Sequence, residues 1–171
     1  MVFGRLRNYF QTTSTVSPSA SPATSFTLTI PSDTQEIPTV LDWLDTHYGL
    51  LHPEDLWKLK IVLSEWLTNV LLYAHRDLPA TTPIQIHCQH QGNQLQIEVW
   101  DYGPPFDLTT QLQRQRQLLQ SETQGDPLEA LSDGGRGLFY IQTLTDQLRY
   151  YRTTSDPQQN CLQVQKKVRL R

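Results

Sequence analysis

The segment from about residue 56 to residue 75 constrains the fold most, because its apolar residues recur at the spacing of an α-helix. At about 100° per residue they fall on one narrow stripe. The stripe consists of Leu56, Leu59, Leu63, Leu67, Val70 and Ala74. The preceding Pro53-Glu54-Asp55 is typical of a first helical turn, with proline early and acids near the positive end of the helix dipole. A long helix with one apolar stripe must pack against a second layer of structure.

Short segments that alternate apolar and polar residues predict the strands of that second layer. They lie at 26–30, 84–88, 95–100, 147–153 and 162–170, with hairpin turns at 91–94 and 155–157. Further helices are predicted over 33–48, with Ser32 as N-cap and Gly49 at the end, and from Leu138 through Ile141 and Leu144 to Leu148. This order favours an α/β two-layer sandwich, with a mixed, mainly antiparallel sheet and the helices on one face.

Two segments lack a regular pattern. Residues 11–25 are rich in Ser, Thr and Pro, so we expect 1–25 to be a disordered leader and 26–171 to be the single folded domain. Residues 108–133 are rich in Gln with few apolar anchors, so we expect a mobile loop there with a short helix near 112–119.

Charge and composition exclude several functional classes. The 14 basic and 17 acidic residues of this 171-residue chain give a net charge of -3, which offers no general attraction to nucleic acid or an anionic membrane. No apolar run approaches the ~20 residues that span a bilayer, and the N-terminus lacks the apolar middle of a signal peptide. Cys88 and Cys161 form no metal-binding pattern. We therefore expect a cytoplasmic domain that contacts neither nucleic acid nor membrane.

Glu65 and Asn69 are the first candidates for chemistry, because they lie four residues apart and so share one face of the long helix. A solvated face would explain such a pair, but the neighbouring residues on that side are largely apolar: Ile61, Val62, Trp66, Leu72 and Tyr73. The pair is therefore expected to border a partly covered cavity. There an Asn oxygen can bind a hard cation, and a Glu can accept a proton.

Two glycine-containing segments are the other candidates. Asp101-Tyr102-Gly103-Pro104-Pro105-Phe106-Asp107 follows a predicted strand, and is either a plain turn or a site where Asp101 accepts a hydrogen bond from a ligand amino group. Gly134-Gly135-Arg136-Gly137-Leu138 precedes a predicted helix, and is either a flexible linker or a site where backbone N–H groups meet a phosphate. No P-loop pattern occurs in the chain.

Together, and in this order, the three segments resemble the motifs of the GHKL ATPases, the superfamily of gyrase, Hsp90, histidine kinases and MutL. Residues 64–69 resemble its N-box, residues 101–107 its G1 box, and residues 135–138 its G2 box. The SExxTN, PFD and GGRGLFxI forms are most similar to the serine kinases that act as bacterial anti-sigma factors. The likeness covers about residues 26–171 and implies the histidine-kinase-like ATPase fold.

The resemblance implies roles for these positions. Asn69 would coordinate Mg2+, Glu65 would act as general base, and Asp101 would bind the adenine amino group, with Gly103 allowing the backbone to approach the base. Gly135 and Gly137 would hold the phosphates of ATP, and residues 108–133 would form the ATP lid. The further residues implied in cofactor binding are Tyr73, Arg136 and Leu138.

The implied activity is phosphorylation by ATP of a serine on a small antagonist protein, in a partner-switching pathway. A sigma factor as second partner and a homodimer are also implied. The alternative is a regulator of the same fold that binds nucleotide and partner without catalysis. The catalytic half of a histidine kinase is set aside, because a dimerisation region with an acceptor His would have to precede it, and only about 25 residues do.

The chain departs from the family pattern at two places. Relatives often have a His four residues after the N-box Asn, where this chain has Tyr73, and a His follows only at His75. The lid segment has two cations, Arg114 and Arg116, and the resemblance does not say which of them contacts phosphate. We interpret the other histidines as ordinary surface or strand residues: His47, His52, His87 and His90.

Overall fold

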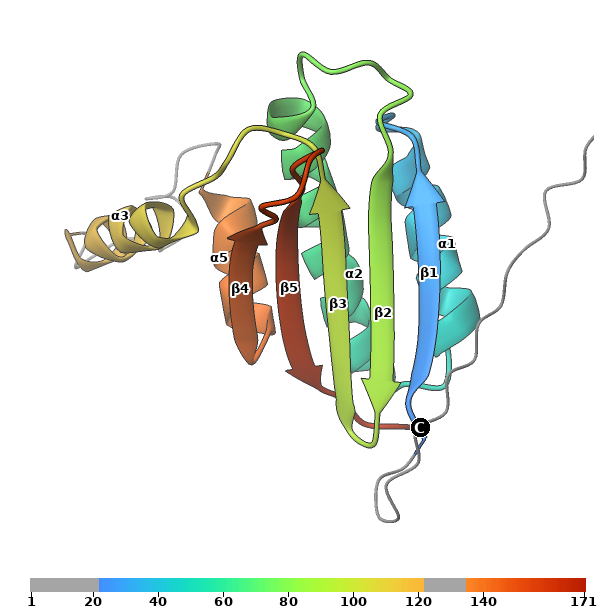
Figure 1. Cartoon of the computed structure of the whole chain (residues 1–171). Helices are drawn as coiled ribbons and strands as arrows, with labels where there is room; N and C mark the ends of the chain where they lie inside the picture. Colours follow the sequence, from blue (N-terminus) through green and yellow to red (C-terminus); the bar gives the residue numbers. More distant parts are fainter. Residues whose placement is uncertain (1–21, 122–134) are drawn as a thin grey trace, which may run out of the picture.

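The computed structural model describes residues 22–121 and 135–171, which form a two-layer α/β sandwich (Figure 1). One layer is a five-stranded sheet in the order β1-β2-β3-β5-β4, in which every neighbouring pair is antiparallel. The strands are β1 (Thr24–Ile30), β2 (Ile84–Gln91), β3 (Gln94–Asp101), β4 (Gln147–Arg152) and β5 (Asn160–Lys167). The predicted fold class is thus confirmed, and the described sheet is wholly antiparallel rather than mixed.

Helices α1 (Glu36–Tyr48), α2 (Pro53–Asn69) and α5 (Arg136–Leu144) cover one face of the sheet (Figure 1). The predicted stripe of α2 forms much of the core, since Leu59, Leu63 and Leu67 are at most 1% exposed. They pack with alternate residues of β2 and β3, whose burial follows the predicted period of two. Neither cysteine is in a disulfide, and both are buried.

Several predicted boundaries move. β1 begins at Thr24, two residues before the predicted start of order, because Thr24 and Ser25 pair with β2. Residues 1–21 lie outside the described residues. The prediction that the last helix reaches Leu148 is wrong: α5 ends at Leu144, and Leu148 belongs to β4. The predicted N-cap at Ser32 is also wrong, because α1 begins at Glu36 without a side-chain cap.

The segment predicted to be a loop begins as a helix, α3 (Leu108–Ser121), which is longer than the short helix expected at 112–119. Asp107 caps it, because its carboxylate accepts hydrogen bonds from the backbone N–H and the hydroxyl of Thr110, at 3.0 and 2.6 Å. Glutamine also has a favourable helix propensity, so a Gln-rich segment can form a helix. The rest of the predicted lid, 122–133, lies outside the described residues.

The long helix continues beyond α2 as a single π-helical turn, η1 (Val70–Ala74). Its mark is the hydrogen bond from the His75 N–H to the Val70 carbonyl, five residues back, at 2.7 Å. Within residues 22–121 and 135–171, none of the helices has the length and apolar character needed to cross a membrane.

Candidate functional site

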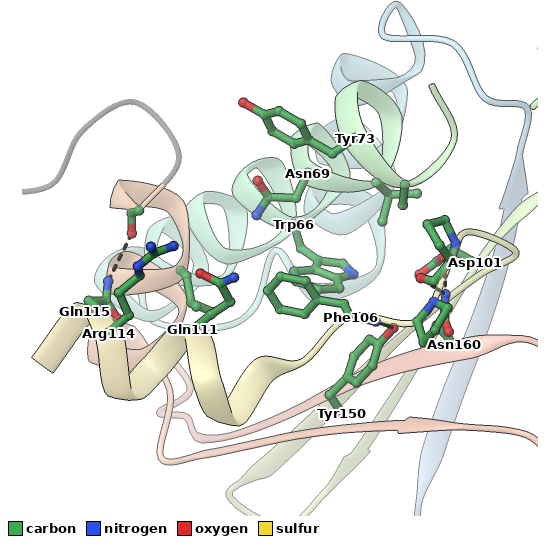
Figure 2. Close-up of a pocket in the computed structure, with 16 residues that line it drawn as sticks. Trp66, Asn69, Tyr73, Asp101, Phe106, Gln111, Arg114, Gln115, Tyr150 and Asn160 are labelled. Carbon is green, nitrogen blue, oxygen red and sulfur yellow. Dashed lines mark hydrogen bonds between the residues drawn. The ribbon is translucent and has the colours of Figure 1, made fainter. Parts of the chain in front are cut away.

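A cavity of about 510 Å3 lies where α2, η1, α3 and the start of α5 meet the ends of β3, β4 and β5 (Figure 2). Its volume is in the range of small-molecule sites. All three predicted motifs reach it. The predicted site residues that line it are Asn69, Tyr73, Asp101, Gly135 and Leu138. Glu65, Gly103, Arg136 and Gly137 lie beside these residues in the chain or on the same helix, but do not line the cavity themselves.

Glu65 and Asn69 both face the start of α5, but only Asn69 of the pair lines the cavity. A Cβ atom placed on Gly137 would lie 2.7 Å from Glu65 Oε2 and 3.5 Å from Asn69 Nδ2. Gly137 therefore allows α5 to pack closely against this pair. The N-box on α2 and the G2 box on α5 are thus brought together where these two helices pack on each other.

Asp101, the last residue of β3, is 1% exposed and lines the cavity. Its Oδ1 accepts hydrogen bonds from the Gly103 N–H and from Asn160 Nδ2, both at 2.8 Å. Among the described residues, no hydrogen-bond donor occupies Oδ2. Burial raises the pKa of Asp101, while the hydrogen bonds from Asn160 and Gly103 oppose that rise by stabilising the carboxylate. One oxygen is thus held by the protein, and the other remains available to a ligand amino group.

Gly103 serves the packing of the protein rather than the lining of the cavity. A Cβ atom there would lie 2.6 Å from Ala74 Cβ and 2.8 Å from the Ala74 carbonyl oxygen. Glycine is therefore required where the G1 loop crosses η1. The Gly103 carbonyl is held in turn by Asn160 Nδ2 at 2.9 Å and Arg152 Nη1 at 3.0 Å.

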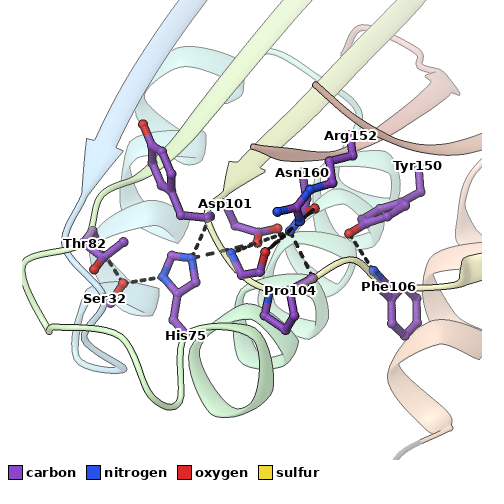
Figure 3. Close-up of polar contacts among 11 residues, drawn as sticks. Ser32, His75, Thr82, Asp101, Pro104, Phe106, Tyr150, Arg152 and Asn160 are labelled. Atoms are coloured by element: carbon purple, nitrogen blue, oxygen red, sulfur yellow. Dashed lines mark hydrogen bonds and ion pairs between the residues drawn. The ribbon is translucent and has the colours of Figure 1, made fainter. Parts of the chain in front are cut away.

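His75 is a site residue that sequence reasoning noticed but did not assign. Its side chain is buried, and its Nε2 accepts a hydrogen bond from the Tyr102 N–H at 3.0 Å (Figure 3). Its Nδ1 lies 2.6 Å from Ser32 Oγ, which itself donates to the Thr82 carbonyl at 2.7 Å. These partners assign a neutral ring with its proton on Nδ1. Burial lowers the pKa of His75, which agrees with that assignment.

The π-helical turn explains why a His two residues beyond the expected position can support the G1 box. Tyr73, at the expected position, is 61% exposed at the mouth of the cavity. The extra residue in the turn instead directs His75 inward, 3.9 Å from Asp101 Oδ1. No local sequence pattern predicted this turn. The position of His75, two residues beyond the His of the family pattern, is the feature of the sequence that reflects it.

The start of α5 meets the lid helix. Gln115 of α3 is 4% exposed and donates from Nε2 to the Gly135 carbonyl at 3.0 Å. Of the two lid cations, Arg114 lines the cavity and Arg116 does not. Gly134, the first residue of the predicted motif, lies outside the described residues.

One wall of the cavity is aromatic, which the sequence did not reveal. Trp66, Phe106 and Tyr150 come from α2, the G1 loop and β4, and their ring centroids lie 5.8 to 6.3 Å apart. Tyr150 Oη also accepts a hydrogen bond from the Phe106 N–H at 3.1 Å. These three side chains come from distant segments, so only the fold brings them together.

The residues that line the cavity fit a metal ion that is held mainly by the phosphates of a bound nucleotide and only in part by the protein. Within the described ranges, no three His, Cys, Asp or Glu side chains gather as a metal-binding group. Asn69 offers an amide in the cavity, and no described residue forms a hydrogen bond with it. A single amide suits Mg2+, which keeps several waters and binds phosphates together with one or two protein oxygens.

Comparison with known proteins identifies one matching family profile and several related proteins. The profile described as "Histidine kinase-like ATPase domain" matches residues 30–166. A serine-protein kinase RsbW from Listeria innocua is 32% identical over 99 residues, which cover 57% of this chain and 59% of that protein. The Staphylococcus aureus RsbW is 26% identical over 99 residues, covering 58% and 60%. The matches thus span about three fifths of the length of these relatives.

Among solved structures, a chain in the SiaB-SiaC complex from Pseudomonas aeruginosa is similar with a TM-score of 0.55 and 12% identity. The similarity covers 84% of this chain and 89% of that one, and shows the shared fold. With four fifths of the sequence matched by one family profile and the fold in agreement, the chain belongs to the family of histidine kinase-like ATPase domains.

Proposed function

We propose that this protein binds ATP with Mg2+ and phosphorylates a serine on a small antagonist protein, as a serine kinase of the anti-sigma factor type. The observation that carries the proposal is the meeting of the three motifs at one cavity, with Asn69, Asp101 and Gly135 all in its lining. The similarity to the RsbW serine-protein kinases supports the type of kinase.

The base of ATP is proposed to bind at the Asp101 end of the cavity. The free Oδ2 of Asp101 accepts a hydrogen bond from the adenine amino group, while Asn160 and Gly103 hold Oδ1. A carboxylate fixed in this way selects a base that carries an amino group.

The phosphates are proposed to lie between Asn69 and the start of α5. Asn69 would contribute the protein's oxygen to Mg2+, and the ion would supply neutralisation of the phosphate charge. Gly135 presents backbone at the beginning of α5, where the helix dipole favours an anion. Arg114 adds a positive charge to the same cavity.

Glu65 is proposed to accept the proton of the incoming serine hydroxyl. It lies one helical turn before Asn69, with its carboxylate close to Gly137. Among the described residues, no ion pair or hydrogen bond occupies that carboxylate, so it is available as a base.

The partner is proposed to be a small protein with an acceptor serine, and a sigma factor is proposed as the second partner of a homodimer. The chain is proposed to work in the cytoplasm. The SiaB-SiaC structure contains a protein of this fold in a complex. Because the sequence identity is only 12%, the similarity supports the fold and not the identity of a partner.

The test is phosphate transfer from γ-labelled ATP and Mg2+ to the antagonist protein purified from the same organism, compared with Glu65→Gln. Labelling of a serine by the wild type and its loss in Glu65→Gln would support the proposal. Nucleotide binding without any serine labelling would contradict catalysis and favour the alternative, a regulator that binds nucleotide and partner only. The position of Glu65 outside the cavity lining is the observation that keeps this alternative in view.

A further inference from the structure

Trp66 lies in the cavity lining, yet none of the family motifs assigns it a role there. It is 5% exposed, and its Nε1–H is buried without a hydrogen-bond partner among the described residues. Leaving a buried donor unpaired costs about 1–3 kcal/mol, so such groups in a folded protein call for a physical explanation.

The cavity holds a second polar atom of this kind. Gln115 Oε1 is also buried without a partner, although its Nε2 donates to the Gly135 carbonyl. Two of the four such side-chain atoms among the described residues therefore belong to residues that border this one cavity. A ligand in the cavity that carries complementary polar atoms would supply the partners that these two atoms lack.

The surroundings of Trp66 indicate which part of a ligand it meets. Its ring lies edge-on to Phe106 and to Tyr150, with centroids 6.1 and 6.3 Å away. In Figure 2 the indole nitrogen is on the side of the ring that faces Asp101 in the view. The aromatic wall and the Asp101 carboxylate thus lie at one cavity, where a flat base would meet both.

We propose that Trp66 is a nucleoside-binding residue: its ring packs against the base, and its indole N–H donates to a nitrogen or oxygen acceptor of the nucleoside. The donor of Trp66 and the acceptor of Asp101 then form a complementary pair for a base that presents an acceptor beside an amino group. This inference rests on the proposed nucleotide site and adds a specificity-determining residue to it.

The experiment measures adenosine and ATP binding by calorimetry for the wild type, Trp66→Phe and the control Trp57→Phe. Phe keeps an aromatic ring and removes the N–H, and Trp57 lies on the same helix but is 59% exposed and outside the cavity lining. We expect Trp66→Phe to weaken adenosine and ATP binding to a similar extent, roughly three- to tenfold, because the lost contact is to the nucleoside. Trp57→Phe should bind as the wild type does.

A second measurement remains informative if Trp66→Phe does not fold. The wild type has four Trp residues, so its 15N-labelled indole groups give four NMR signals, and the Trp66 signal is assigned by elimination with single Phe variants at 43, 57 and 100. Addition of adenosine is expected to shift the Trp66 signal most.

The outcomes separate this inference from the proposed function. If the wild type binds ATP while Trp66→Phe binds equally well and the Trp66 signal does not move, the inference is wrong and the ATP site stands. If the wild type binds neither adenosine nor ATP, both are wrong. A similar loss for both ligands, with a shifted Trp66 signal, supports the inference.

Discussion

The two carboxylate oxygens of Asp101 have different partners: the protein holds Oδ1, and the proposed ligand binds Oδ2. Oδ1 is fixed by two donors, and Oδ2 is free of described partners. An Asn at this position keeps an oxygen for the Gly103 N–H and for Asn160, but turns an N–H2 group toward the cavity. Asp101→Asn is therefore expected to weaken ATP binding by about 1–3 kcal/mol with little loss of stability. Calorimetry and urea unfolding check the two effects, and an unchanged affinity would contradict the assignment.

His75 makes stability depend on pH. Burial lowers its pKa in the fold, whereas an unfolded chain binds a proton at about pH 6.5. The unfolded state then binds more protons below that pH, so the free energy of unfolding falls as the pH decreases from about 6.5. A variant His75→Gln lacks this titration, and its stability should approach that of the wild type as the pH falls. Urea unfolding at a series of pH values tests this, and parallel pH profiles would refute it.

Among the helices, the close approach of α5 to α2 depends on Gly137, which has no side chain. A methyl group on Gly137 would meet the carboxylate of Glu65, which can rotate away at little cost in stability. Gly137→Ala is therefore expected to slow phosphate transfer at least tenfold, given that misplacing a catalytic group by about 1 Å can cost about 100-fold. ATP affinity should change much less. Steady-state kinetics of phosphate transfer test this prediction. A transfer rate equal to that of the wild type would contradict the proposed role of Glu65 as general base.

Elements with clear periodicity were predictable from the sequence. The stripe of α2 and the alternation of β2 and β3 follow from burial on one face, so these elements were placed within a few residues. The Asp107 cap of α3 was missed because the Gln-rich segment has few apolar anchors. The π-helical turn of η1 and the aromatic wall at Trp66 depend on tertiary packing, which no local pattern encodes.

At the scale of the whole molecule, the C-terminal segment closes onto the start of α2. Arg169 donates to both carboxylate oxygens of Asp55, at 2.9 and 3.0 Å, and to Glu54 at 2.9 Å. Asp55 is 4% exposed, and the hydrogen bonds from Arg169 lower its pKa to about 2. Its contribution to stability is complete above about pH 4 and is lost as the pH falls toward 2. The C-terminus thus stabilises the helix that carries the site.

Arg169→Ala leaves the buried Asp55 carboxylate without its cation. Although Arg169 itself is 56% exposed and partly screened, the loss of its contacts to the buried Asp55 carboxylate is expected to lower the free energy of unfolding at pH 7 by more than the loss of a surface ion pair does. Lys60→Ala breaks only the surface pair with Asp45 and should cost at most about 1 kcal/mol. Urea unfolding compares the two, and equal effects would show that the C-terminal contact adds no more than a surface pair.

The cavity is proposed to hold ATP through a metal ion bound by Asn69. The most direct test is the affinity for ATP, by calorimetry, with Mg2+ and with a chelator, for the wild type, Asn69→Ala and the control Thr68→Ala, whose hydroxyl donates to the Ser64 carbonyl of the same helix. We predict that Mg2+ strengthens ATP binding to the wild type and to Thr68→Ala, and that Asn69→Ala loses about 1–3 kcal/mol of that gain. A wild type that binds no ATP, or an Asn69→Ala variant with an undiminished response to Mg2+, would contradict it.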